Sequence, residues 1–132
     1  MLTFICLTEC QGYAKYIDLA KTPNGSIYSP NYPSSYGSSQ DCSWRLHAPQ
    51  GRKVLIYFTF LDLEDCCSCD YAQVFDGRDE YDGLLTKACN GSFPRPVYSS
   101  GQYMYLQFHS DWGVQGKGFV AHYKVLSVLS GK

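Results

Sequence analysis

The sequence contains no long hydrophobic run and no cluster of basic residues. None of its apolar stretches approaches the roughly 20 residues that a helix needs to cross a bilayer, so we expect no membrane insertion by this domain. Its 11 Lys and Arg residues are mixed with 12 Asp and Glu residues, which gives a formal net charge of -1. No basic stripe is present that could neutralise a row of phosphates, and we therefore expect no nucleic acid partner.

Common catalytic motifs are also missing. There is no His-Glu-x-x-His zinc-protease motif, no Gly-x-Ser-x-Gly nucleophile motif and no phosphate-binding P-loop. The three histidines are far apart in the sequence, and nothing in the pattern places a nucleophile beside a base. The sequence thus favours a binding or structural module over an enzyme.

The apolar residues show no sustained helical repeat and alternate with polar residues instead. Alternation with a period of two runs through 42–46, 54–60, 104–108 and 119–125, and such alternation is typical of half-buried strands. Turn-forming residues separate these segments, and the Asn-Gly pair at 24–25 predicts a turn. Several short strands joined by turns predict an all-β protein that folds as an antiparallel β-sandwich.

An immunoglobulin domain is one alternative sandwich, but its buried Trp lies on the strand that follows the first disulfide cysteine. Here Cys42 and Trp44 share one face of the same strand, so we reject this alternative. We expect Trp44 to be a core residue because it carries one of the largest apolar surfaces in the chain.

Cysteine is abundant, with seven residues in a chain of 132. In a reducing cytosol these thiols would serve a metal or a catalytic site, whereas a secreted domain of this size would use them in disulfides. The cluster at 66–69 could bind zinc together with an isolated histidine (His47, His109 or His122). Structural zinc sites normally draw on two paired clusters, however, and the sequence has no second one.

Two N-glycosylation sequons begin at Asn24 and Asn90. They are compatible with the secretory pathway, which also forms disulfides. We therefore expect a secreted protein, or the extracellular part of a larger protein.

Several short motifs follow one another along the chain. They are Gly-Ser-Ile-Tyr-Ser-Pro-Asn-Tyr-Pro at 25–33, Cys-Ser-Trp at 42–44, Phe-Leu-Asp-Leu-Glu at 60–64, Cys-Ser-Cys-Asp-Tyr-Ala-Gln-Val-Phe-Asp-Gly at 67–77, Ser-Ser-Gly at 99–101, Phe-His-Ser-Asp at 108–111 and Gly-Phe-Val-Ala-His-Tyr at 118–123. Their order and spacing closely resemble the CUB domain family. Two positions depart from the family pattern, because Cys69 replaces a usual Tyr and Ala72 replaces a larger apolar residue.

The resemblance implies a CUB jelly roll, that is, an antiparallel β-sandwich with disulfide staples. It places the domain at 16–126, with 1–15 as a leader or N-terminal extension and 127–132 as a C-terminal tail.

The resemblance also implies two disulfides. One joins Cys67 to Cys89, and the other joins Cys42 to an upstream partner. At the family spacing that partner would fall near Tyr16, so Cys10 is the nearest upstream candidate.

The remaining cysteines leave alternatives open. Cys66 and Cys69 could bridge each other, and the odd Cys6 would then belong to an interchain bridge or to an unfolded leader.

Many CUB domains bind one calcium ion through three acids at one end of the sandwich, and the matching acids here are Glu64, Asp70 and Asp111. Calcium prefers oxygen ligands, and three neighbouring carboxylates without a cation would repel one another. The resemblance adds the backbone carbonyl of Gly113, whereas Val114 replaces a ligating Asn, so that a water would take its place. The alternative is that these acids cap turns or pair with Arg and Lys.

In CUB domains with these acids, the carboxylates ordered by calcium receive a Lys or Arg of a protein ligand through charge-assisted hydrogen bonds. The resemblance therefore implies an extracellular protein ligand as the partner, with Tyr71 and Trp112 as apolar flanks of the site. Two alternatives are a lectin-like module that binds a carbohydrate or mucin through exposed Tyr residues, and a structural module of a larger secreted protein.

Overall fold

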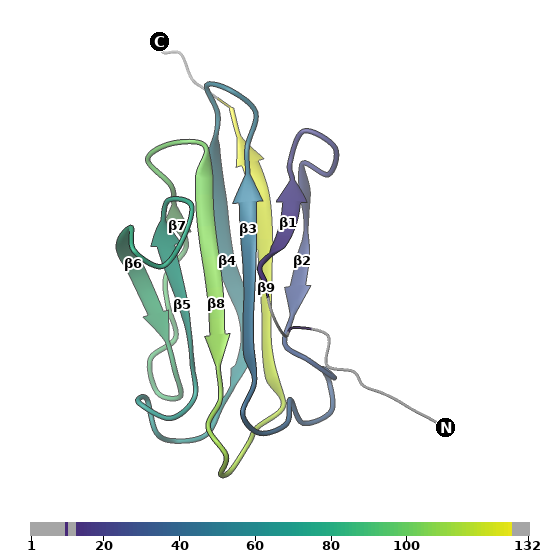
Figure 1. The fold of residues 1–132 in the computed structure, drawn as a ribbon, viewed down its shortest axis with the longest axis vertical. Coiled ribbons are helices and arrows are strands. Elements are labelled where there is room, and N and C mark those ends of the chain that lie inside the picture. The colour runs from purple at the N-terminus through teal and green to yellow at the C-terminus, as the bar shows by residue number, and fades with distance from the viewer. Residues whose placement is uncertain (1–9, 11–12, 128–132) are drawn as a thin grey trace.

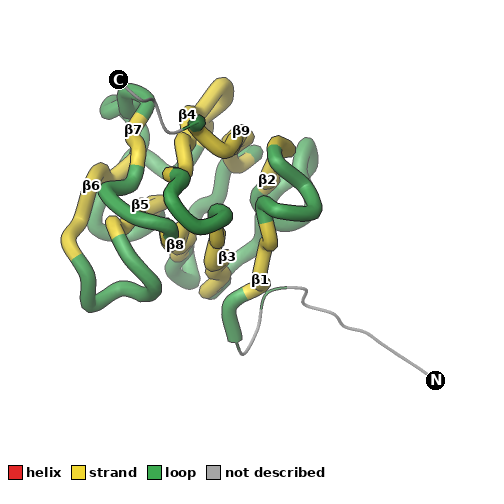
Figure 2. The backbone as a smooth tube through the Cα atoms, turned by 90° about the horizontal axis from the view of Figure 1, so that it is seen from above, coloured by secondary structure: helices red, strands yellow, loops and turns green. Residues whose placement is uncertain are grey.

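The computed structural model describes residue 10 and residues 13–127. This part of the chain forms a five-stranded sheet, with the order β1-β3-β8-β5-β6, and a four-stranded sheet, with the order β2-β9-β4-β7 (Figure 1). Figure 2 shows the two sheets end-on as two layers. The strands are β1 (Lys15–Asp18), β2 (Asn24–Tyr28), β3 (Asp41–His47), β4 (Lys53–Asp62), β5 (Tyr71–Asp76), β6 (Gly83–Ala88), β7 (Val97–Tyr98), β8 (Tyr103–His109) and β9 (Gly118–Leu126).

The predicted all-β sandwich is confirmed. Neighbouring strands pair antiparallel, except that β1 runs parallel to β3. The four alternating segments lie in β3, β4, β8 and β9, which occupy inner positions of the two sheets. No helix in the described part of the chain has the length and hydrophobicity to span a bilayer. Most of the expected extension at 1–15 and of the expected tail at 127–132 lies outside the described residues, as does Cys6.

The Asn-Gly pair at 24–25 does not form the predicted turn. It begins β2, an edge strand that pairs with β9. A Cβ atom at Gly25 would lie 2.6 Å from the hydroxyl oxygen of Tyr123. Glycine is therefore required here because the Tyr123 ring packs against the backbone.

The core between the sheets is rich in aromatic rings. Phe119 is fully buried, and its ring lies 6.0, 5.8 and 5.4 Å from the rings of Trp44, Phe58 and Phe108, measured between centroids. Trp44 has the core position predicted for it, with 8% of its surface exposed. Tilted and edge-to-face aromatic pairs add to the stabilisation from buried area. This packing holds the two sheets together and so fixes the loops at their ends.

Three disulfides link the described cysteines: Cys10–Cys42, Cys66–Cys69 and Cys67–Cys89. They include both pairs that the family resemblance implies, and the local bridge within the 66–69 cluster. A bridge that closes a loop of the size of the one between Cys67 and Cys89 stabilises a fold by about 3 kcal/mol in the chain-entropy model. Because Cys66 and Cys67 are consecutive but enter different bridges, the loop before β5 is tied both to itself and to the end of β6.

Candidate metal centre

Three loops meet at one end of the sandwich, which is the lower end in Figure 1. They are 29–40 between β2 and β3, 63–70 between β4 and β5, and 110–117 between β8 and β9. Glu64, Asp70 and Asp111, the acids predicted from the resemblance, lie in the second and third of these loops. The fold therefore brings together acids that are up to 47 positions apart in the sequence.

A buried pair, Tyr36 and Asp70, joins the three loops, and both side chains are completely inaccessible to solvent. The Tyr36 hydroxyl donates to Asp70 Oδ2 at 2.5 Å and accepts from the Glu64 amide at 3.1 Å. The other oxygen of Asp70, Oδ1, accepts from the amide of Asp111 at 3.0 Å. Burial and the hydrogen bond to Asp70 raise the pKa of Tyr36, so this hydroxyl keeps its proton and acts as a donor.

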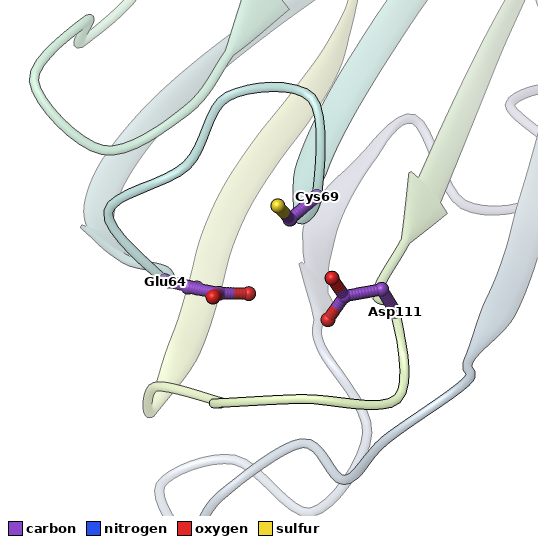
Figure 3. A group of neighbouring side chains, drawn as sticks. All are labelled: Glu64, Cys69 and Asp111. Atoms are coloured by element: carbon purple, nitrogen blue, oxygen red, sulfur yellow. The ribbon is translucent and has the colours of Figure 1, made fainter.

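The carboxyl groups of Glu64 and Asp111 face each other across the gap between their loops (Figure 3). One side-chain ligand atom from each of Glu64, Cys69 and Asp111 lies within 4.8 Å of the others. The sulfur of Cys69 is bonded to that of Cys66, and a metal ligand must be a thiolate. The donors in this group are therefore the two carboxylates.

Glu64 has a carboxylate oxygen without a hydrogen-bond partner. Its Oε1 atom is shielded from solvent and has no hydrogen-bond partner. Desolvation raises the pKa of the Glu64 carboxyl, and the negative charges of Asp111 and Asp70 raise it further. An unpartnered, shielded oxygen beside two other acids is what a cation with a preference for oxygen ligands would relieve. The residues present thus fit a calcium ion.

The loop after Asp111 differs from the predicted ligand set. The Gly113 amide donates to Asp111 Oδ1 at 3.0 Å, which places Gly113 beside the acids. Its carbonyl oxygen, however, accepts a hydrogen bond from the Gln115 side chain. Val114 points outward, with 66% of its surface exposed. The Gly113 carbonyl would therefore have to exchange the Gln115 amide for a metal.

The two residues predicted to flank the site have different surroundings. Trp112 lies in the 110–117 loop with 84% of its surface exposed. Tyr71 begins β5, and its ring lies between the Lys87 ammonium, 4.3 Å from the ring centroid, and the ring of His109 at 5.2 Å. Burial raises the pKa of Tyr71, and the charge of Asp41 adds to the shift. Trp112 is available to a partner, whereas much of the Tyr71 ring surface is covered by its neighbours.

The zinc alternative has no donor set among the described residues. All three cysteines of the 66–69 cluster are in disulfides. The histidines bond to their own sheets instead: His47 to Tyr16, His109 to Asp41, and His122 to Ser26 and Thr59.

Sequence reasoning missed the roles of Tyr36 and Gln115. Tyr36 lies three residues after the 25–33 motif, but its hydrogen bonds depend on three loops that meet only in the fold. Nothing in the sequence signals the contact between Gln115 and the Gly113 carbonyl.

The family model described as CUB domain matches residues 10–123. Human Tolloid-like protein 1 is 36% identical over 102 residues, which cover 76% of this chain and 10% of that protein. The chain thus spans about a tenth of the length of this relative.

Two solved structures are similar in fold. The full extracellular region of zebrafish Gpr126/Adgrg6 is 33% identical with a TM-score of 0.76, over 92% of this chain and 15% of that one. The MASP-1 CUB2 domain bound to Ca²⁺ is 24% identical with a TM-score of 0.71, over 83% of this chain and 96% of that one. The chain therefore belongs to the CUB domain family, whose members are extracellular, non-catalytic interaction modules.

Proposed function

We propose that this domain binds one calcium ion through Glu64, Asp70 and Asp111, and that the ordered carboxylates then bind a basic side chain of an extracellular protein. The observation that carries the proposal is the Glu64 Oε1 atom, which is shielded from solvent and lacks a partner. A carboxylate oxygen in this position costs free energy unless a cation or a donor satisfies it.

Each acid would have a different task. Asp70 is held by Tyr36 and by the Asp111 amide, so its position is fixed before any ion arrives. Glu64 and Asp111 approach from opposite loops and would close on the ion. The MASP-1 CUB2 domain, which has the same fold, is bound to Ca²⁺. Because Val114 has no ligating atom in its side chain, water would supply the remaining oxygen.

Calcium, when bound, supplies positive charge that offsets the repulsion among the three acids. Carboxylate oxygens that face solvent keep lone pairs for a Lys or Arg of the partner, and such charge-assisted hydrogen bonds are stronger than neutral ones. Trp112 adjoins Asp111 and is largely exposed, so it would pack against the methylene groups of the incoming side chain. The proposed partner is a protein that presents a basic residue.

A direct test measures the binding of calcium, and then of a basic peptide, to the domain by isothermal titration calorimetry. We expect one calcium per chain, and calcium-dependent binding of a Lys-containing peptide that is lost when every Lys of that peptide is acetylated. Glu64→Gln should abolish both. Binding of the unmodified peptide with equal affinity in chelator would reject a role of calcium in recognition.

A hollow away from the metal centre favours carbohydrate binding as a second candidate function. A cavity of about 370 Å³ lies beside the edge strands β1 and β2, and Tyr13, Tyr28 and Tyr32 are among its lining residues. The rings of Tyr28 and Tyr32 stack with centroids 5.5 Å apart. Tyr side chains combine an apolar ring with a hydroxyl, which suits a sugar. A glycan array probed in chelator tests this candidate, because this hollow would not need calcium.

A further inference from the structure

The outer face of the four-stranded sheet carries a hollow of about 290 Å³ whose lining residues include Asn24, Ser26, Tyr57, His122 and Lys124. These residues come from three neighbouring strands. Ser26 on β2 lies opposite His122 on β9, which lies opposite Tyr57 on β4. Asn24 lies opposite Lys124, one step along the same face. The hollow thus extends from the edge of the sheet toward its centre.

The floor of this hollow is rigidly positioned. The imidazole of His122 is hydrogen-bonded on both sides, with Nδ1 2.8 Å from Ser26 Oγ and Nε2 2.9 Å from Thr59 Oγ1. The ring of Tyr57 stacks on it at 5.2 Å with an interplanar angle of 28°. A ring held by two hydroxyl groups loses little conformational freedom when a ligand packs against it.

The chemistry of the lining suits a hydroxyl-rich ligand. Aromatic surface lies beside hydroxyl, imidazole and amide groups and the Lys124 ammonium, and none of the residues that line the hollow is an acid. Such a mixture packs the C–H face of a sugar on a ring while hydrogen-bonding its hydroxyl and N-acetyl groups.

Asn24 connects this hollow with one particular ligand. It is the first residue of a glycosylation sequon, it is exposed, and it lies at the rim of the hollow. A glycan attached there would be held next to the hollow, so its packing would be intramolecular and would need little intrinsic affinity.

We propose that an N-linked glycan on Asn24 folds back over the sheet and that its first N-acetylglucosamine residues occupy the hollow above Tyr57 and His122. The glycan would also cover β2, an exposed edge strand that could otherwise pair with another chain. Asn24 begins β2 and the metal-centre loops follow its end, so the glycan would leave the calcium site open. The inference is independent of the proposed calcium binding.

The second sequon provides a matched control. Asn90 lies in a short turn where the Ser92 amide donates to the Cys89 carbonyl at 2.9 Å, and both Gly91 and Ser92 are exposed. A glycan attached to Asn90 would start from this turn, and Asn90 is not among the residues that line the hollow.

The experiment uses the full chain secreted from mammalian cells. Mass spectrometry first measures occupancy, and the glycans are then removed enzymatically. We expect deglycosylation to lower the Tm by about 2–4 °C, as expected for a loss of contacts of this extent, and to shift the ring signals of His122 in NMR spectra. Asn24→Gln should abolish both effects, whereas Asn90→Gln should retain them. Ser26→Ala is unsuitable because it also removes the hydrogen bond to His122.

A second pair of variants tests the packing itself. Tyr57→Leu should abolish the glycan-dependent change in Tm. Tyr98→Leu, which removes an exposed ring from the residue opposite Leu55 on the same sheet, should leave it intact. The proposal fails if Asn24 is unoccupied in the secreted protein. It also fails if removal of an occupied Asn24 glycan changes neither the Tm nor the His122 signals.

Discussion

Removal of the Asp111 carboxylate should abolish the stabilisation of this domain by calcium. Asp111 faces Glu64 across the metal centre, and its amide is bonded to the buried Asp70. Asp111→Ala therefore removes one of the three proposed acidic ligands but keeps the backbone hydrogen bond that links the loops. The variant tests the site without dismantling its support.

The magnitude follows from linkage. Extracellular modules bind calcium with dissociation constants of about 10⁻⁴–10⁻³ M. At about ten times that constant, an ion that binds only the folded state stabilises it by about 1.4 kcal/mol. For a domain of this size, that free energy corresponds to a rise in Tm of about 3–6 °C.

Differential scanning calorimetry with calcium and with chelator measures the effect. The matched control is Asp79→Ala, because Asp79 lies between β5 and β6 at the opposite end of the sandwich, where its carboxylate accepts from the Tyr81 amide. The control should keep the full calcium-dependent rise. A rise of the same size in Asp111→Ala would refute the ligand assignment.

The absence of a rise in the wild type would have a specific explanation. Val114 stands where the family resemblance implies a ligating Asn, and it is largely exposed. Val114→Asn should then restore calcium binding, since an exposed position tolerates the change. If Val114→Asn also failed to respond to calcium, the proposed site would be wrong.

Three further predictions concern the described residues. Non-reducing peptide mapping should find Cys67 joined to Cys89, and a Cys69–Cys89 peptide would contradict this register. The pKa of the Glu64 carboxyl is raised in the folded protein, so metal-free protein should lose stability as the pH rises from the ordinary Glu pKa through the raised pKa. Thermal melts in chelator measure this loss, and Glu64→Gln should not show it. Gly118→Ala should lower the free energy of unfolding in urea by about 3 kcal/mol, since the φ angle is +108° and a Cβ would lie 1.7 Å from Ser29 Oγ. A normal urea midpoint for this variant would contradict the packing around Gly118.

The sequence predicted the centre of the fold better than its edges. Strands β3 and β4 alternate between buried and less buried residues, and β8 and β9 do so over part of their length, so sequence alternation marks them. The edge strands β1 and β6 are short and mostly exposed or half-buried, and their residues carry little of this pattern. The Asn-Gly pair of β2 was misinterpreted because sequence cannot distinguish a glycine needed for φ from one needed to admit a neighbouring ring.

The acids of the candidate site could be predicted from their places in the family motifs, but their burial and their hydrogen-bond partners could not. That Asp70 is buried and fixed by Tyr36 depends on loops far apart in the chain. The bond from Gln115 to the Gly113 carbonyl depends on the local path of the 110–117 loop. Sequence motifs identify which acids are present, whereas the folded geometry decides which hydrogen-bond donor each oxygen accepts from.

The consecutive cysteines Cys66 and Cys67 imply an order of maturation. Their two bridges fix the loop that carries Glu64, so a reduced chain would have to order this loop at the moment it bound an ion. That ordering costs about 1–2 kcal/mol for each residue fixed, which is comparable to the gain expected from calcium. If the site binds calcium as proposed, we expect oxidation of these thiols to come first, so that a reduced chain binds calcium more weakly than the oxidised chain.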